Sequence, residues 1–225
     1  MRLVVTPNQV EVVAPLGVAK SQIHAFVAMK QDWVIKVKNK FEAALRTEKK
    51  EEIEQFTTGV LVSYQGQKIK MSLYTSSLAK VKVELSEQEF NVYLPDLANL
   101  LDQRDKSEMV RLAIIDWMQQ QAIKQVKNHA EAYAKKYNLY PRTVKIKTQK
   151  SRWGSCGIHN DIHINWLLIM APSEVLEYVV VHELCHIKER NHSANFWNLV
   201  AKQLPEYQKQ RNWLKQHGHR LMQGL

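Results

Sequence analysis

The residues best suited to chemistry form the pattern His-Glu-x-x-His at positions 182 to 186. Residues four apart lie on one face of a helix, so His182 and His186 can direct both imidazoles at one point. Glu183 lies about 100° round the helix from His182 and can reach that point without binding it. Neutral imidazoles suit zinc, and a neighbouring carboxylate can take a proton from zinc-bound water. The pattern predicts a zinc-dependent hydrolase with Glu183 as general base.

A catalytic zinc usually has three protein ligands and one open position for water. His192 is the preferred third ligand because it follows His186 by six residues, just beyond the expected end of the helix. In the alternative without a metal, residues 191–193 only cap the next helix, and the two helical histidines are satisfied within the core. The other candidates for the third ligand are Glu206, His217 and His219.

The composition is that of an ordinary globular protein, with 225 residues, 45% hydrophobic and 24% charged. No run of about 18 apolar residues and no signal-peptide pattern is present, so we expect a cytoplasmic protein without a membrane partner. The two cysteines, Cys156 and Cys185, do not make a disulfide framework, and we expect them to be reduced. The net charge of +10 favours an anionic partner, such as a nucleotide or DNA, although it can also serve solubility alone.

The apolar patterns predict an α+β protein with an N-terminal region over 1–100. Alternating residues 2–5 and 10–14 predict a hairpin, and helical spacing of apolar residues follows from 19 to about 50. This region contains no catalytic constellation, so we expect it to pack or to position substrate. Four more strands are expected at 60–64, 68–74, 81–85 and 90–94.

The second predicted domain, 101–225, contains the metal motif. A long helix is expected over 106–138, opening at Ser107, because serine suits a helix start. Pro172 begins the metal-motif helix. The glycines of 152–157 predict a tight turn between two strands. The remaining elements are strands at 143–148 and 161–166 and helices at 194–203 and 206–217.

With these segments located, the chain resembles the YgjP-like metal-dependent hydrolase family, which is related to the WLM and SprT-like zinc metallopeptidases. The resemblance covers most of the chain, including residues 1–37. It implies a zincin-like domain with a long backing helix, a small antiparallel sheet and the metal-bearing helix. It also implies one zinc ion held by His182, His186 and His192, with Glu183 as base. The matching segments are Arg152–Cys156, Ile164–Trp166, Ala171–Pro172, Tyr178–His186, Asn191–Ser193 and Phe196–Trp197.

The residues around the motif suggest how substrate is held. Arg152, Ser155 and Tyr178 are the candidate substrate-binding residues, and Arg211 joins Arg152 and Tyr178 as a candidate for stabilising an oxyanion. Trp153 and Cys156 are expected to pack beneath the metal helix. His163 is a candidate fourth ligand. The strand at 161–166 is either a sheet edge that receives an extended peptide or an internal strand.

Three functions are consistent with these residues. A metallopeptidase acting on peptides or proteins is the leading hypothesis. A metal-dependent nucleoside triphosphate pyrophosphatase, or another phosphoanhydride hydrolase, is the alternative, although the chain lacks a glycine-rich phosphate loop. The third is a non-enzymatic zinc-binding or DNA-associated adaptor, and the presence of Glu183 argues against it because a structural zinc site needs no base.

Overall fold

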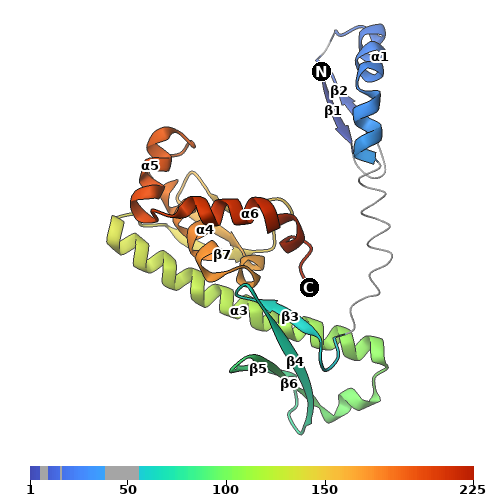
Figure 1. Cartoon of the computed structure of the whole chain (residues 1–225), viewed down its shortest axis with the longest axis vertical. Coiled ribbons are helices and arrows are strands. Elements are labelled where there is room, and N and C mark those ends of the chain that lie inside the picture. The colour runs from blue at the N-terminus through green and yellow to red at the C-terminus, as the bar shows by residue number, and fades with distance from the viewer. Residues whose placement is uncertain (6–9, 16, 39–55) are drawn as a thin grey trace. The chain divides into compact units, whose positions relative to one another are not determined.

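The computed structural model describes residues 1–5, 10–15, 17–38 and 56–225. The chain forms two compact units, Met1–Glu54 and Gln55–Leu225 (Figure 1). The sequence analysis placed a boundary at 100/101, which falls inside the second unit. The strands expected between 60 and 94 therefore belong to the same compact unit as the metal motif.

The first unit contains the predicted hairpin. Strand β1 (Arg2–Val5) pairs antiparallel with β2 (Val10–Val13), and helix α1 (Lys20–Met29) follows. Residues 31–38 are also helical. The hairpin turn at 6–9 and the rest of the predicted helix, up to about 50, lie outside the described residues.

The second unit is organised along helix α3 (Gln103–Tyr137). Its buried residues recur every four positions, and each step of four advances by about 40° round a helix of 3.6 residues per turn. The buried stripe therefore winds around α3 and meets different partners along its length (Figure 1). These partners include β5 (Lys82–Ser86), β7 (Thr143–Lys147), the short helix η2 (Trp166–Met170) and α4 (Ser173–Cys185). The stripe consists of Val110, Ile114, Met118, Ala122, Val126, Ala130 and Ala134.

The start of α3 differs from the prediction. Asp102 is the N-cap, and its side chain accepts a hydrogen bond from the Asp105 backbone N–H at 2.8 Å. Ser107 lies inside the helix and is buried, and its Oγ accepts a hydrogen bond from the Phe56 N–H at 2.8 Å. The prediction was wrong because the serine hydroxyl satisfies a distant backbone group instead of the helix end.

The larger sheet contains all four strands expected between 60 and 94. They are β3 (Leu61–Tyr64), β4 (Gln67–Ser76), β5 (Lys82–Ser86) and β6 (Glu89–Pro95). Their order is β3-β4-β6-β5, with β4 and β6 parallel and the other pairs antiparallel. A short helix, η1 (Asp96–Leu100), leads from β6 towards α3. One face of the sheet supplies core residues, among them Val62, Ile69, Met71, Phe90, Val92 and Leu94.

The smaller sheet has the order β7-β9-β8, and its strands are β7 (Thr143–Lys147), β8 (Gly154–Cys156) and β9 (Asp161–Asn165). Because β9 runs parallel to β7 and antiparallel to β8, the sheet is mixed, where the sequence analysis expected an antiparallel one. Strand β9 is internal, and β8 is an edge. The tight turn lies at 157–160, where the Gly157 N–H donates to the Asp161 carbonyl at 2.9 Å, rather than within 152–157.

Helix α4 (Ser173–Cys185) carries the first part of the metal motif and begins after Pro172, as predicted. It packs against α3, η2 (Trp166–Met170), β8, β9, α5 (Ala194–Gln203) and α6 (Tyr207–Leu221). Nine of its 13 residues are buried, as expected for a helix covered on nearly all sides. The predicted α+β fold class is confirmed. No helix in the described ranges has the length and apolar character needed to cross a membrane.

Candidate metal centre

The three histidines of the motif meet at one place. His182 lies in α4, His186 is the C-cap of that helix, and His192 lies in the loop before α5. One ligand atom from each lies within 4.8 Å of the others. The Nε2 atoms of His182 and His192 are 3.0 Å apart. Two imidazole nitrogens at this separation need a proton or a metal ion between their lone pairs, so the donor set fits a metal.

Hydrogen bonds orient two of the three rings. His186 Nδ1 lies 2.9 Å from the Glu189 carbonyl oxygen, to which it donates, and Nε2 is left as the metal-binding nitrogen. His182 Nδ1 lies 3.5 Å from the Tyr178 hydroxyl. Burial lowers the pKa of His182 to about 3, and the electrostatic influence of the neighbouring histidines and of Arg211 acts in the same direction. Burial also lowers the pKa of His186. Both rings are therefore neutral near pH 7, the form that binds a metal.

The rival ligands do not join the group. Within the described residues, the three histidines are the only set of three or more His, Cys, Asp or Glu side chains that could hold a metal. Glu206 lies beside Lys209 instead. His163 lies in β9 opposite Lys145 of β7 and Ser155 of β8.

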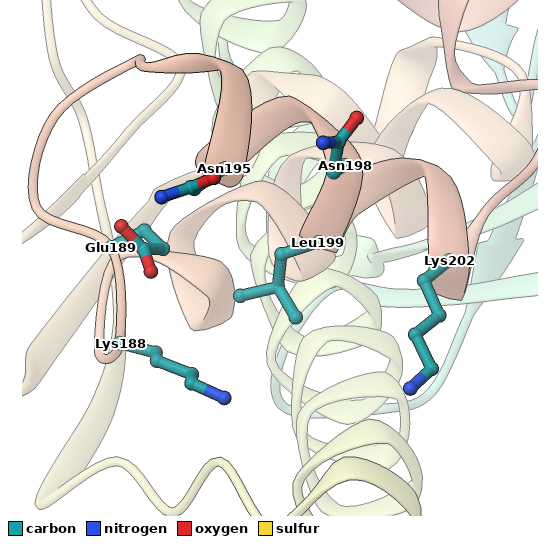
Figure 2. Close-up of a pocket in the computed structure, with 6 residues that line it drawn as sticks. All are labelled: Lys188, Glu189, Asn195, Asn198, Leu199 and Lys202. Atoms are coloured by element: carbon teal, nitrogen blue, oxygen red, sulfur yellow. The ribbon is translucent and has the colours of Figure 1, made fainter.

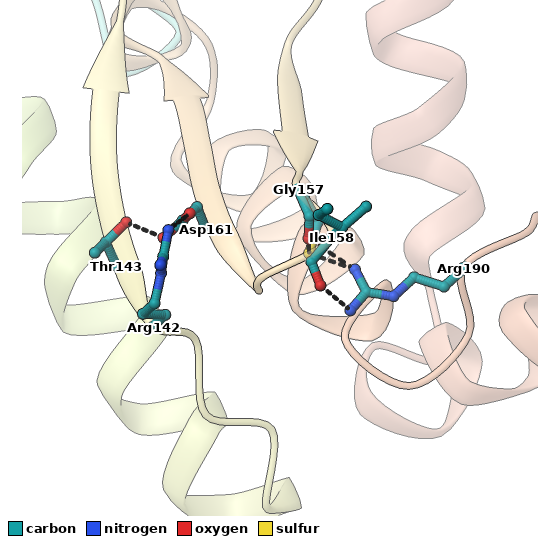
Figure 3. Close-up of polar contacts among 7 residues, drawn as sticks. Arg142, Thr143, Gly157, Ile158, Asp161 and Arg190 are labelled. Carbon is teal, nitrogen blue, oxygen red and sulfur yellow. Dashed lines mark hydrogen bonds and ion pairs between the residues drawn. The ribbon is translucent and has the colours of Figure 1, made fainter.

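Arg190 fastens the loop that carries His192 to the turn between β8 and β9 (Figure 3). Its guanidinium donates to the carbonyl oxygens of Gly157 at 2.9 Å and Ile158 at 3.4 Å, and to Asn160 Oδ1. In the same figure, Arg142 and Thr143 bind the Asp161 carboxylate and so fix the start of β9 to β7. Sequence reasoning missed Arg190 because its partners lie some 30 residues away and leave no local pattern.

Glu183 is held in a narrow slot between α4 and β8. Its side chain is only 6% exposed, and burial raises its pKa to about 8. A cation at the histidines would oppose this shift because it favours the charged carboxylate. A Cβ at Gly154 would lie 2.6 Å from Glu183 Oε1, so the strand approaches the carboxylate this closely only because residue 154 is glycine. The sequence analysis assigned Gly154 to a turn, whereas the structure gives it this steric role.

The predicted substrate residues lie in three different environments. Side chains alternate along a strand, so Ser155 points to the face opposite Gly154 and away from Glu183. Arg152 is exposed, and no hydrogen bond or ion pair in the described part of the chain joins its side chain to the histidines. Tyr178 is 4% exposed and lies behind His182. Of the three, only Tyr178 is brought to the site, as a partner of a histidine.

Trp153 and Cys156, which were expected to pack beneath the metal helix, are partly buried against the core. The Trp153 ring lies against Gly218 of α6, where an added Cβ would come within 3.2 Å. Cys156 is half-buried, and burial raises the pKa of its thiol. Cys185 is fully buried, its pKa is raised to about 12, and its sulfur accepts a hydrogen bond from Gln203 at 3.1 Å. Neither thiol has the lowered pKa of a nucleophile.

An aromatic wall surrounds the histidines. Phe196 is fully buried and stacks on His186 with ring centroids 4.4 Å apart. Trp197 stacks on His192 at 5.6 Å and on Tyr207 at 5.4 Å. The guanidinium of Arg211 lies 4.3 Å from the centre of the Trp197 ring. These contacts join α5 and α6 to the ligand loop.

A separate hollow of about 240 Å³ lies beside α5 (Figure 2). None of the three histidines lines it. Two lysines, two asparagines and a glutamate give it a mostly polar lining, and Leu199 lies among them. The residues around it are Lys188, Glu189, Asn195, Asn198, Leu199 and Lys202.

Two comparisons with known proteins agree with this site. A family described as YgjP-like, metallopeptidase domain, matches residues 1–217. The UTP pyrophosphatase of Escherichia coli (strain K12) is 30% identical over 90 residues, which are 37% of this chain and 54% of that protein. The match thus spans about half the length of that relative. The family match confirms the resemblance seen in the sequence and supports a metal-dependent hydrolase.

Proposed function

The chain belongs to the YgjP-like family, and on this premise we propose that it is a zinc-dependent hydrolase in which Glu183 moves the proton. The observation that carries the proposal is the meeting of three imidazoles within 4.8 Å beside one buried carboxylate. Three neutral nitrogen donors suit zinc, whereas magnesium prefers oxygen ligands. When bound, zinc would acidify a water molecule and polarise the bond to be cleaved.

The protein's own groups then carry out the proton transfers. Glu183 takes a proton from the attacking water and gives it to the leaving group. The slot formed by Gly154 limits the rotation of the carboxylate and keeps most water away from it. Tyr178 and the Glu189 carbonyl hold the rings of His182 and His186 in the orientation that directs Nε2 inward.

The peptide bond is the first candidate substrate. Strand β8 is an edge of its sheet, and its Gly154 lies against Glu183. An extended peptide can add to such an edge through main-chain hydrogen bonds, which would place a peptide bond beside the carboxylate. The sequence analysis considered β9 for this role, but β9 is internal. The description of the family as a metallopeptidase domain supports the same candidate.

The phosphoanhydride bond is the second candidate. The relative named as a UTP pyrophosphatase supports it, and so does the positive charge of Arg211 near His182. Attack by the same activated water at phosphorus would need no further residue for the proton transfer.

The test combines metal binding with turnover. Wild type, Glu183→Gln and His192→Ala are assayed for zinc content, zinc affinity and hydrolysis of casein and UTP. We expect one zinc per chain, weaker zinc binding in His192→Ala, and a turnover loss of roughly 10²–10⁴-fold in Glu183→Gln with zinc retained. Absence of zinc binding in wild type would contradict the proposal. The substrate consumed decides between the two candidates.

A further inference from the structure

Arg211 places a permanent positive charge beside the metal centre. Its guanidinium lies over the Trp197 ring, and the centre of that ring is 5.8 Å from His182 and 5.6 Å from His192. Trp197, which contacts the guanidinium, and Tyr207, which stacks on Trp197, belong to the aromatic wall described above.

The hydrogen-bonding edge of Arg211 is unused in the described part of the chain. No carboxylate there pairs with it, and no hydrogen bond from its N–H groups reaches another described residue. A guanidinium that lies over an indole is attracted to the ring by its charge, and its N–H donors that face away from the ring remain available. A fork of donors held in this way matches the paired oxygens of a phosphate.

The charge of the surrounding segments points to a polyanion. Residues 186–225 contain seven Lys or Arg and two Asp or Glu, and so hold half of the net charge of +10. Glu206, one of the two acidic residues, is already paired with Lys209. A surface of this sign concentrates anions near the site and speeds their arrival.

We propose that Arg211, held on Trp197, forms an anion subsite that binds a phosphate group of a nucleoside triphosphate next to the bond cleaved at the metal centre. The inference rests on the phosphoanhydride form of the proposed function. It assigns Arg211 to substrate binding, while Glu183 and the three histidines perform the reaction.

The test measures binding of inorganic triphosphate to the full chain by calorimetry, with and without zinc. The variants are Arg211→Gln, Arg211→Lys and the control Arg220→Gln. Arg220 is exposed and lies nine residues further along α6, about 13 Å along the helix. We expect Arg211→Gln to weaken triphosphate binding at least 10-fold and Arg220→Gln to change it less than about twofold. Arg211→Lys should fall between them because lysine keeps the charge and loses the fork.

Several outcomes overturn the inference. It fails if wild type does not bind triphosphate, if Arg211→Gln binds as tightly as wild type, or if Arg220→Gln weakens binding equally. It also fails if an acidic tripeptide, and not triphosphate, shows the dependence on Arg211. Zinc content and melting temperature establish that the variants are folded. If Arg211→Gln does not fold, Arg211→Lys takes its place in the comparison with wild type.

The same variants separate this inference from the proposed function. If triphosphate binding depends on Arg211 and wild type does not hydrolyse UTP, the subsite stands and the phosphoanhydride function fails. If UTP is hydrolysed equally well by wild type and Arg211→Gln, the function stands and the subsite fails.

Discussion

The two sheets of the second unit differ in what they contribute. The larger sheet, β3-β4-β6-β5, supplies core residues such as Phe90 and Met71 from one face. On its other face, Tyr74 and Tyr93 stack on each other. The smaller sheet, β7-β9-β8, contributes Gly154, which leaves room for the Glu183 side chain, and the β8–β9 turn, to which Arg190 donates hydrogen bonds. This site therefore depends on close approaches and fastened loops, whereas the larger sheet mainly stabilises the unit.

The largest effect on stability is expected in the larger sheet. Phe90→Ala removes a fully buried ring that packs edge-on against Trp117, and should lower the free energy of unfolding by about 3–5 kcal/mol. Denaturant unfolding measures the loss, and calorimetry on the folded variant should give the zinc affinity of wild type. The matched variant Ile164→Ala in β9 should lower both stability and turnover, because Ile164 lies opposite Gly154. A change in zinc affinity of more than about threefold in Phe90→Ala would show that the larger sheet also shapes the metal site.

Within the smaller sheet, the largest effect on turnover is expected at Gly154. In Gly154→Ala the new methyl group would overlap the Glu183 carboxylate, so we expect turnover to fall about 100-fold, of the order found when an active-site group is misplaced. Zinc stoichiometry should remain one per chain. The assay uses whichever of casein or UTP the wild type cleaves. Gly157→Ala is the control, because its Cβ would meet only ordinary contacts, the nearest at 3.6 Å. An equal loss of turnover in both variants would show that the loss does not arise from crowding of the Glu183 carboxylate.

A smaller effect is expected at Arg190, which anchors the loop with His192 to the β8–β9 turn. Arg190→Met keeps the aliphatic stem but removes the donors to the β8–β9 turn. The loop with His192 then loses its anchor, and zinc affinity should fall about 10-fold, as for other partners of metal ligands. Competition with a chelator measures the affinity. Lys188→Met removes a charge from the same loop and should leave zinc affinity within about twofold, which separates anchoring from charge.

The smallest effect is expected at Ser155. Its side chain lies on the sheet face away from Glu183, opposite His163. Ser155→Ala should therefore change turnover less than about twofold and stability by less than about 0.5 kcal/mol. Steady-state kinetics and thermal unfolding measure the two quantities. A tenfold loss of turnover would support the substrate-binding role that the sequence suggested for Ser155. It would also contradict the conclusion that Ser155 and Glu183 lie on opposite faces of the smaller sheet.

Much of the fold followed from local patterns. The start of α4, the limits of α5, the four strands of the larger sheet and the two strands of the first hairpin agree with the sequence analysis within a few residues. Errors arose where a side chain served a distant partner. Ser107 was taken for a helix cap because its bond to Phe56 cannot be read from its neighbours. The turn was placed too early because Gly154 and Gly157 look alike in sequence.

The sequence by itself determined the pair His182 and His186 and the adjacent Glu183, because helical periodicity fixes where residues four apart point. It also indicated His192, from its distance beyond the helix. Only the tertiary structure decided that four rival ligands stay out of the group, namely Glu206, His163, His217 and His219. It also decided that Gly154 makes room for the carboxylate, that Arg190 binds the β8–β9 turn and that Arg211 lies over Trp197. Local backbone geometry sets the first kind of relation, whereas the second depends on how elements far apart in the chain pack together.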